Sequence, residues 1–426
     1  MLTQGPGWTA PPLRLDDVGR TIAIEPAMTA LQRPRALLKR IPYSRVSCGG
    51  NELAYVKEVL ESGWLTTASK AQALERRFAA AVGSRFACAV NSCTSALHLG
   101  LEAVGVQARD KVLVPTMTFT ATAEVVRYLG ADPVFLDVEY GSSLVTPGIL
   151  RDALDRYPDV RALIVVHFAG QPAQMLDEDG APGLLEICRR RGVRVLEDAA
   201  HAFPTRCGDR MVGALGDATC FSFYANKTIT TGEGGMLTTD NPAIAARARV
   251  MRLHGIDRDV WDRFTAAKPA WEYDVIAPGY KYNMPDVNAA IGLAQLERAH
   301  IMRDRRQQIA ARYFRRLAGH EHLDLPLVRV PPEDHAWHLF VVVVKPTARL
   351  GRDRLVELLA ERSIGTSVTY KPLHHMTYYR DRYGLDAAGF PSAERIWKGC
   401  LALPIYPSLE DEEVDHVCDT LLDLLG

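Results

Sequence analysis

Lys227 lies at a position where a lysine can be a reactive amine. The segment FSFYANKTITTGEGGM (221–236) begins with a strand-like alternation, and Lys227 follows it, just before a loop rich in Thr and Gly. A lysine near apolar residues at a sheet edge can have its pKa lowered and attack an aldehyde as a nucleophile. Most lysines are exposed and carry only surface charge, so this residue taken alone supports both interpretations.

Two acidic residues end the apolar run VRVLED (193–198). A carboxylate at the end of a buried strand is costly unless it has a partner. Asp198 can reach a cationic group over the sheet edge, or it can cap the turn that follows it. His201 shares a face with Asp198 if a helical turn begins there, and a solvent-exposed histidine is the alternative.

An anion site and a flat aromatic surface are also encoded. NSCTSALHLG (91–100) opens a helix directly after a strand, and its backbone amides and the Thr94 hydroxyl can bind an anion or serve only as an ordinary helix cap. In PTMTFTATAE (115–124), Phe119 can stack on a flat ligand or pack in the core.

Together these segments match the needs of pyridoxal phosphate. A lysine binds the aldehyde of this cofactor, a carboxylate keeps its pyridine nitrogen protonated, and a helix end binds its phosphate. Lys227, Asp198 and the helix at Thr94 supply these groups, and Ser222 can add a hydroxyl. The combination is more specific than any one residue in it.

The surrounding pattern predicts the sheet that positions these groups. From about residue 84 to 240, apolar runs with little alternation are separated by helical stretches, which indicates a largely parallel sheet covered on both faces. This is a three-layer α/β domain, in which ligands gather at the carboxyl ends of the strands. The predicted strands include FACAV (86–90), VLVP (112–115), PVFLDV (133–138), ALIVVHF (162–168) and VRVLED (193–198).

The C-terminal part predicts a smaller α+β domain. A helical stretch at 286–317 can bridge two lobes, and a last helix follows a capping pair of Ser408 and Asp411. We divide the chain into an N-terminal extension (1–40), a large α/β domain that binds the cofactor (41–300) and a small C-terminal α+β domain (301–426). Residues 41–60 are able to pack on the small domain.

The composition excludes several classes of protein. The 426 residues carry a formal net charge of −1, so no global charge directs the chain to nucleic acid or acidic lipid. The eight cysteines form no CxxC pair and no cluster at metal spacing, so we expect reduced core cysteines, no metal site and a cytoplasmic location. We also predict no membrane span and no export signal.

Several ordered motifs resemble the DegT/DnrJ/EryC1/StrS family of sugar aminotransferases, from about residue 41 to the C-terminus. The resemblance implies a fold-type-I enzyme that uses pyridoxal phosphate and works as a homodimer with active sites at the subunit interface. The family's dehydratase branch carries histidine at the lysine position, so Lys227 favours transamination. The motifs are SGWLTT, NSCTSALHLGLEAVGV, VPTMTFTATAEVV, VLEDAAHAF, FSFYANKTITTGEGGML, GYKYNMPDVNAAIGLAQLER, WHLFVVVV, YKPLH and LPIYPSL.

The resemblance also implies residue roles. Lys227 matches the lysine that binds the cofactor covalently, Asp198 the partner of the pyridine nitrogen, and His201 the residue near the 3-hydroxyl. The remaining cofactor contacts implied in the same subunit are the stacking ring of Phe119 and the phosphate contacts Thr94 and Ser222.

Two positions depart from the family pattern. Cys93 stands where glycine is frequent, which is tolerated if only its backbone amide is used. The segment GYKYN (279–283) replaces GYNYR, so either Lys281, which we favour, or Asn283 reaches the phosphate of the neighbouring subunit.

The implied reaction moves an amino group from glutamate or glutamine to a nucleotide-linked ketosugar, most simply an NDP-4-keto-6-deoxyhexose. A 3-ketosugar or a keto-cyclitol of antibiotic biosynthesis is the alternative substrate, and a non-catalytic regulatory protein that binds pyridoxal phosphate is the alternative class. Sugar recognition is expected from the SGWLTT segment (Thr66 and Thr67) and from His254 and His374 or His375, although these histidines can equally be solvated loop residues.

Overall fold

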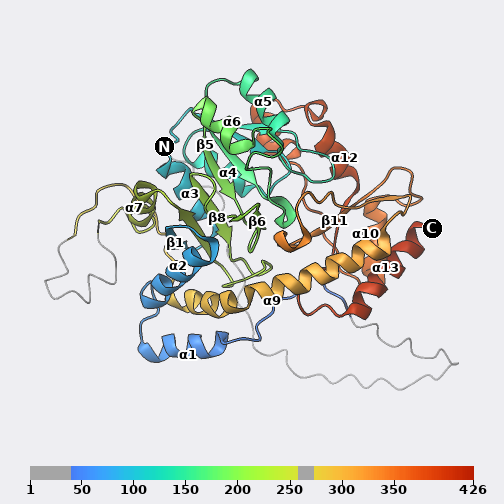
Figure 1. Cartoon of the computed structure of the whole chain (residues 1–426), viewed down its shortest axis with the longest axis horizontal. Helices are drawn as coiled ribbons and strands as arrows, with labels where there is room; N and C mark the ends of the chain where they lie inside the picture. The colour runs from blue at the N-terminus through green and yellow to red at the C-terminus, as the bar shows by residue number, and fades with distance from the viewer. Residues whose placement is uncertain (1–39, 258–272) are drawn as a thin grey trace, which may run out of the picture. The chain divides into compact units, whose positions relative to one another are not determined.

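A seven-stranded sheet forms the centre of the molecule in the computed structural model, which describes residues 40–257 and 273–426 (Figure 1). Among these strands only β9 runs antiparallel to its neighbours, which confirms the predicted, largely parallel sheet. In spatial order the strands are β1 (Phe86–Val90), β9 (Gly235–Thr239), β8 (Ala218–Ser222), β5 (Arg194–Asp198), β4 (Val160–Val166), β2 (Lys111–Pro115) and β3 (Asp132–Leu136).

Helices cover both faces of the sheet, each over its own apolar core. Capping side chains start several of them: Ser92 accepts a hydrogen bond from the Ser95 amide, and Thr146 accepts one from the Ile149 amide. One face carries α3 (Cys93–Ala103), α4 (Ala121–Tyr128) and α7 (Pro242–Met251). The other carries α2 (Ser69–Val82), α5 (Pro147–Arg156), α6 (Leu184–Arg191) and the first half of α9 (Asp286–Leu317).

A second sheet and its own core lie at the far end of α9, which runs from beside α2 to α13 in Figure 1. Because α9 is continuous, the predicted domain boundary at residues 300 and 301 falls inside a helix, and the division into domains stays a prediction. The elements of this part are β10 (Leu323–Asp324), β11 (Phe340–Val344), β12 (Cys400–Leu403), α10 (Arg352–Glu361) and α13 (Asp411–Leu425).

The other elements are short or peripheral. Among the described residues, none of the helices is both long and apolar enough to cross a membrane. The short or peripheral elements are α1 (Glu52–Ser62), α11 (Thr377–Tyr383), α12 (Pro391–Gly399), β6 (Arg206–Cys207), β7 (Arg210–Met211) and the 3₁₀ turns η1 (Phe168–Gly170), η2 (Pro332–Asp334), η3 (Leu373–His375) and η4 (Ala387–Gly389).

Two details concern the chain ends. The predicted cap of the last helix is wrong: Glu410 is the N-cap and forms a capping box with Glu413, because α13 begins three residues after Ser408. Ile41 pairs with Ile364 of the C-terminal part, whereas α1 packs on α9. The N-terminal extension lies outside the described residues except for Arg40.

Candidate active site

A cavity of about 510 Å³ opens where β5 and β8 end and α3 begins. This is the sheet edge at which ligands gather in parallel α/β folds. The sequence-predicted residues that line it together are Cys93, Thr94, Phe119, Asp198, His201, Ser222 and Lys227.

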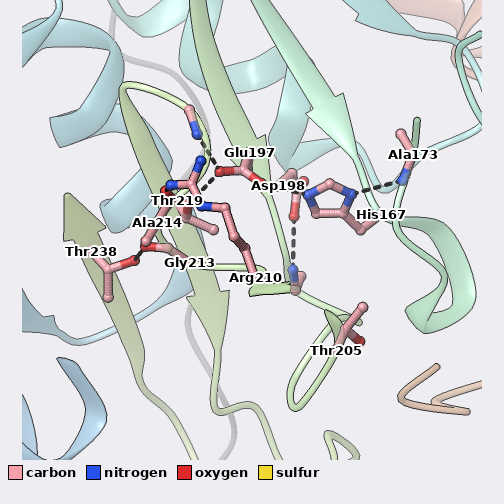
Figure 2. Close-up of polar contacts among 12 residues, drawn as sticks. His167, Ala173, Glu197, Asp198, Thr205, Arg210, Gly213, Ala214, Thr219 and Thr238 are labelled. Atoms are coloured by element: carbon pink, nitrogen blue, oxygen red, sulfur yellow. Dashed lines mark hydrogen bonds and ion pairs between the residues drawn. The ribbon is translucent and has the colours of Figure 1, made fainter. Parts of the chain in front are cut away.

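The two acidic residues of β5 face different surroundings (Figure 2). Asp198 lines the cavity, and its carboxylate accepts hydrogen bonds from the Thr122 hydroxyl (2.8 Å) and the Ala200 amide (3.1 Å). Burial raises the pKa of Asp198, against the opposing effect of these bonds and of Lys227. A protonated ring nitrogen in the cavity is therefore a fitting partner for this carboxylate.

Glu197 points away from the cavity and is satisfied by the protein itself. Its carboxylate accepts hydrogen bonds from Thr219 (2.7 Å) and the Gly216 amide (2.8 Å) and lies 2.9 Å from His167 Nε2. Burial opposes ionisation of Glu197, but these contacts, led by His167, leave its pKa lowered. Glu197 is thus part of the scaffold under the site.

Lys227 is held in a loop that leads from β8 back to β9. Its amide donates to the Tyr224 carbonyl (3.0 Å), and Asn288 of α9 donates to the carbonyls of Thr231 (2.9 Å) and Glu233 (3.0 Å). Burial lowers the pKa of Lys227 to about 8, although Cys93 and Asp198 act in the opposite direction. The amine is therefore neutral far more often than that of an exposed lysine, as a nucleophile or general base requires.

The start of α3 forms an anion cradle that depends on glycine. A Cβ on Gly235 of β9 would lie 2.4 Å from the Ser92 carbonyl carbon and 2.6 Å from the Cys93 nitrogen. Only glycine allows β9 to pass this close to the N-terminus of α3. Thr94 and Ser222 also line the cavity there, so their hydroxyls can bind an anion together with the helix N-terminus. This role of Gly235 is not among the roles expected from the sequence, although the GEGG segment (232–235) marks a glycine-rich stretch here.

Three residues that line the cavity each carry a buried polar atom with no protein partner within the described residues. Asn226 Oδ1, Thr369 Oγ1 and His338 Nδ1 are all enclosed and unpaired. Buried polar atoms are normally hydrogen-bonded, so their gathering here fits a polar ligand. With the lysine, the carboxylate and the cradle, they match the groups of pyridoxal phosphate.

His201 is a neutral hydrogen-bonding group. Its Nδ1 accepts from the Ala169 amide (3.3 Å), so Nε2 carries the proton toward the Tyr370 hydroxyl at 3.1 Å. Burial, followed by the positive charge of Lys227, lowers the pKa of His201 well below its ordinary value. Phe119 is 58% exposed at the cavity rim, its ring centroid 6.0 Å from that of Tyr370, so it is not a core residue.

Lys281, Asn283 and Thr67 form a separate cluster that does not line this cavity. Lys281 donates to Asn283 (2.7 Å), whose amide nitrogen donates to the Thr67 hydroxyl (2.7 Å). Both polar ends of the Asn283 side chain are thus engaged, whereas Lys281 is exposed and its ammonium can donate further hydrogen bonds. Thr66 is exposed and also lies outside the cavity lining.

The predicted substrate histidines are not brought to the cavity either. His254 is exposed, whereas His374 is buried between Thr116 (2.7 Å) and Glu394 (2.8 Å) and is not a solvated loop residue. His374, His375 and Glu394 lie close enough for a metal ion. However, hydrogen bonds with the two rings already satisfy the same Glu394 oxygen.

Comparison with known proteins identifies the class. Residues 47–422 match the model of the DegT/DnrJ/EryC1/StrS aminotransferase family, and the chain belongs to this family. The family resemblance, the α/β fold and the use of pyridoxal phosphate are thereby confirmed, and the protein is a pyridoxal-phosphate-dependent aminotransferase.

Individual relatives span nearly the whole chain. The spore coat polysaccharide biosynthesis protein SpsC of Bacillus subtilis is 42% identical over 390 residues, which cover 90% of this chain and 97% of SpsC. The putative sugar aminotransferase Spr1654 of Streptococcus pneumoniae superposes with a TM-score of 0.81 at 30% identity, covering 91% and 98% of the two chains. The aminotransferase TlmJ of Streptoalloteichus hindustanus gives 0.79 at 31% identity, covering 90% and 98%.

Proposed function

We propose that this aminotransferase acts on a sugar and transfers the amino group of glutamate or glutamine to a nucleotide-linked ketosugar, specifically an NDP-4-keto-6-deoxyhexose. The observation that carries the proposal is the shared cavity of Lys227, Asp198 and the α3 N-terminus. The names of its relatives support a sugar as the acceptor, because SpsC is a polysaccharide biosynthesis protein and Spr1654 a putative sugar aminotransferase.

The residues divide the work of amino transfer between them. Pyridoxal phosphate, when bound, supplies an aldehyde for the lysine and a ring that withdraws electrons from the reacting carbon. Asp198 would balance the positive charge of the ring nitrogen, and the α3 N-terminus with Thr94 and Ser222 would bind the phosphate. Phe119 would cover the ring. Lys227, as a neutral amine, would take the proton from the substrate carbon that bears the nitrogen and would return it to the carbon on the other side of that nitrogen.

We also propose a homodimer in which Lys281 reaches the partner's cofactor phosphate. Exposed apolar side chains on α1 support a partner surface, since Leu53 is 83% and Leu60 58% exposed. We place the enzyme in the cytoplasm and expect no nucleic-acid or membrane partner, in keeping with its near-neutral charge.

A panel of ketosugars tests the proposal. The enzyme loaded with pyridoxal phosphate is first treated with glutamate or glutamine, and the loss of visible absorbance reports the first half-reaction. NDP-4-ketosugars, 3-ketosugars and keto-cyclitols are then offered, and the position of the new amino group is read by NMR. Amination at C4 supports the proposal. Amination only of a 3-ketosugar or only of a cyclitol would show that this compound, and not the 4-ketosugar, is the substrate. No reaction with either amino donor would indicate a regulatory protein.

A further inference from the structure

His338 is a buried cavity residue to which neither the motif reasoning nor the proposed function gives a role. Its side chain is 4% exposed, lines the cavity and lies beside His201, with 4.5 Å between the ring centroids. Nδ1 is enclosed without a partner, and neither ring nitrogen has a hydrogen bond within the described residues. Buried polar groups are normally hydrogen-bonded, so an unpaired imidazole beside a ligand cavity can form its hydrogen bond with a ligand.

The backbone around His338 is built to hold this position. Trp337 has a left-handed φ of 50°, which is unfavourable for a bulky residue. The conformation is fixed from both sides: the Trp337 amide donates to His335 Nδ1 (2.8 Å), and a Cβ on Gly170 would lie only 3.1 Å from the same amide nitrogen. A strained turn held so firmly beside an active site favours a functional reason for it.

A buried guanidinium completes this support. Arg306 of α9 donates to the carbonyls of Trp337 (3.4 Å), His338 (3.3 Å) and Ile405 (2.7 Å). Three contacts from one rigid fork fix the chain on both sides of the His338 side chain. The backbone that carries the His338 side chain is therefore held in place by the scaffold.

The charge state of His338 suits a hydrogen bond to substrate. Burial lowers its pKa well below the ordinary value, and the positive charges of Lys227 and Arg306 act in the same direction. A neutral imidazole offers one donor and one acceptor. It can therefore bind an oxygen without placing a further positive charge near the Lys227 amine.

We propose that His338 binds both substrates through an oxygen on the carbon that neighbours the reacting carbon. The inference rests on the proposed function. In glutamate the α-carboxylate is bonded directly to the amino-bearing carbon, and in a 4-ketosugar the carbon next to the carbonyl carbon bears a hydroxyl. In both substrates an oxygen therefore lies two bonds from the reacting carbon. A single neutral N–H donor can serve both oxygens in turn, although the two molecules differ in size and charge.

Variants of the loaded enzyme test this assignment. His338→Asn retains a hydrogen-bonding atom near the place of Nδ1, whereas His338→Phe keeps a ring and removes both nitrogens. His98→Phe is the matched control, because His98 is also buried with an unpaired nitrogen but lies outside the cavity. Binding of 2-methylglutamate, which has no proton to lose from the reacting carbon, is measured by absorbance titration beside the glutamate half-reaction.

We expect His338→Phe to raise the dissociation constant of 2-methylglutamate about tenfold, the loss of one hydrogen bond, while the cofactor absorbance is unchanged. His338→Asn should recover most of this affinity, and His98→Phe should not change it. An unchanged constant in His338→Phe, or a loss of its cofactor absorbance, would overturn the inference. Failure of the proposed function would instead appear in the wild-type enzyme, as no conversion with either amino donor.

Discussion

Glu197 and Asp198 are neighbours on one strand, but the first is surrounded by protein partners and the second lines the cavity. Both are buried carboxylates on β5, and the alternation of side chains along a strand sends them to opposite faces of the sheet. Glu197 is surrounded by partners from the protein, including His167 and Thr219. Asp198 lines the cavity, and burial raises its pKa.

Hydrogen-bond partners separate the scaffold residues of this protein from its site residues. A buried polar group that is fully hydrogen-bonded contributes to stability, whereas one left unpaired beside a cavity has kept its capacity for a ligand. His374, bound between Thr116 and Glu394, is of the first kind, and His338 is of the second. Residue type alone does not distinguish them.

The largest effect is expected at the cavity. Lys227→Ala should lower kcat at least about 10³-fold, because no other group takes over its proton transfer, and should remove the visible absorbance of the bound cofactor. Steady-state assays and absorbance spectra measure both effects. Retained turnover would show that another residue is the catalytic base.

Asp198→Asn should lower kcat by about 10²–10³-fold, since a neutral amide does not stabilise the positive ring nitrogen. The free energy of unfolding of the apoenzyme should not fall by more than about 1 kcal/mol, because burial already disfavours the charged form. Urea denaturation measures the second quantity. A large loss of stability with normal kcat would make Asp198 a scaffold residue like Glu197.

Glu197→Gln should show the reverse pattern. Breaking the buried contact with His167 should lower the free energy of unfolding by about 3 kcal/mol, with a smaller change in kcat than in Asp198→Asn. The folded pKa of Glu197 lies below the ordinary 4.5, so its stabilisation is present above pH 4.5 and is lost as the pH falls through the folded value. Denaturation of wild type and variant should therefore converge in acid, and a constant difference would contradict the account.

The smallest effect is a shift in reactivity. Because the pKa of Lys227 is lowered to about 8, its neutral fraction grows about tenfold per pH unit below that value. Reductive methylation of the apoenzyme, followed by peptide mass spectrometry, should show Lys227 modified with a midpoint near pH 8. A midpoint near 10.5, the ordinary value, would mean that the cavity does not activate this amine.

The sequence predicted the parallel sheet well because runs of buried apolar residues and helical periodicity are local patterns. The helix at 286–317 and the strand FACAV match α9 and β1 to the residue. It could not predict that His374 is buried with Glu394, because that contact joins residues from different elements.

The missed site residues share the same cause. His338 and Tyr370 reach the cavity from segments more than 100 residues beyond Lys227. They lie in the segments WHLFVVVV and YKPLH, which carry the family resemblance but imply no role for either side chain. Gly235 was visible as part of GEGG, but its close approach to α3 is a property of strand pairing.

The claim that Lys227 binds the cofactor is tested most directly by making the bond between the cofactor and its lysine irreversible. The enzyme loaded with pyridoxal phosphate is reduced with borohydride, digested, and analysed by peptide mass spectrometry. We expect a single phosphopyridoxyl group, on Lys227. Its attachment to any other lysine, or no attachment at all, would contradict it.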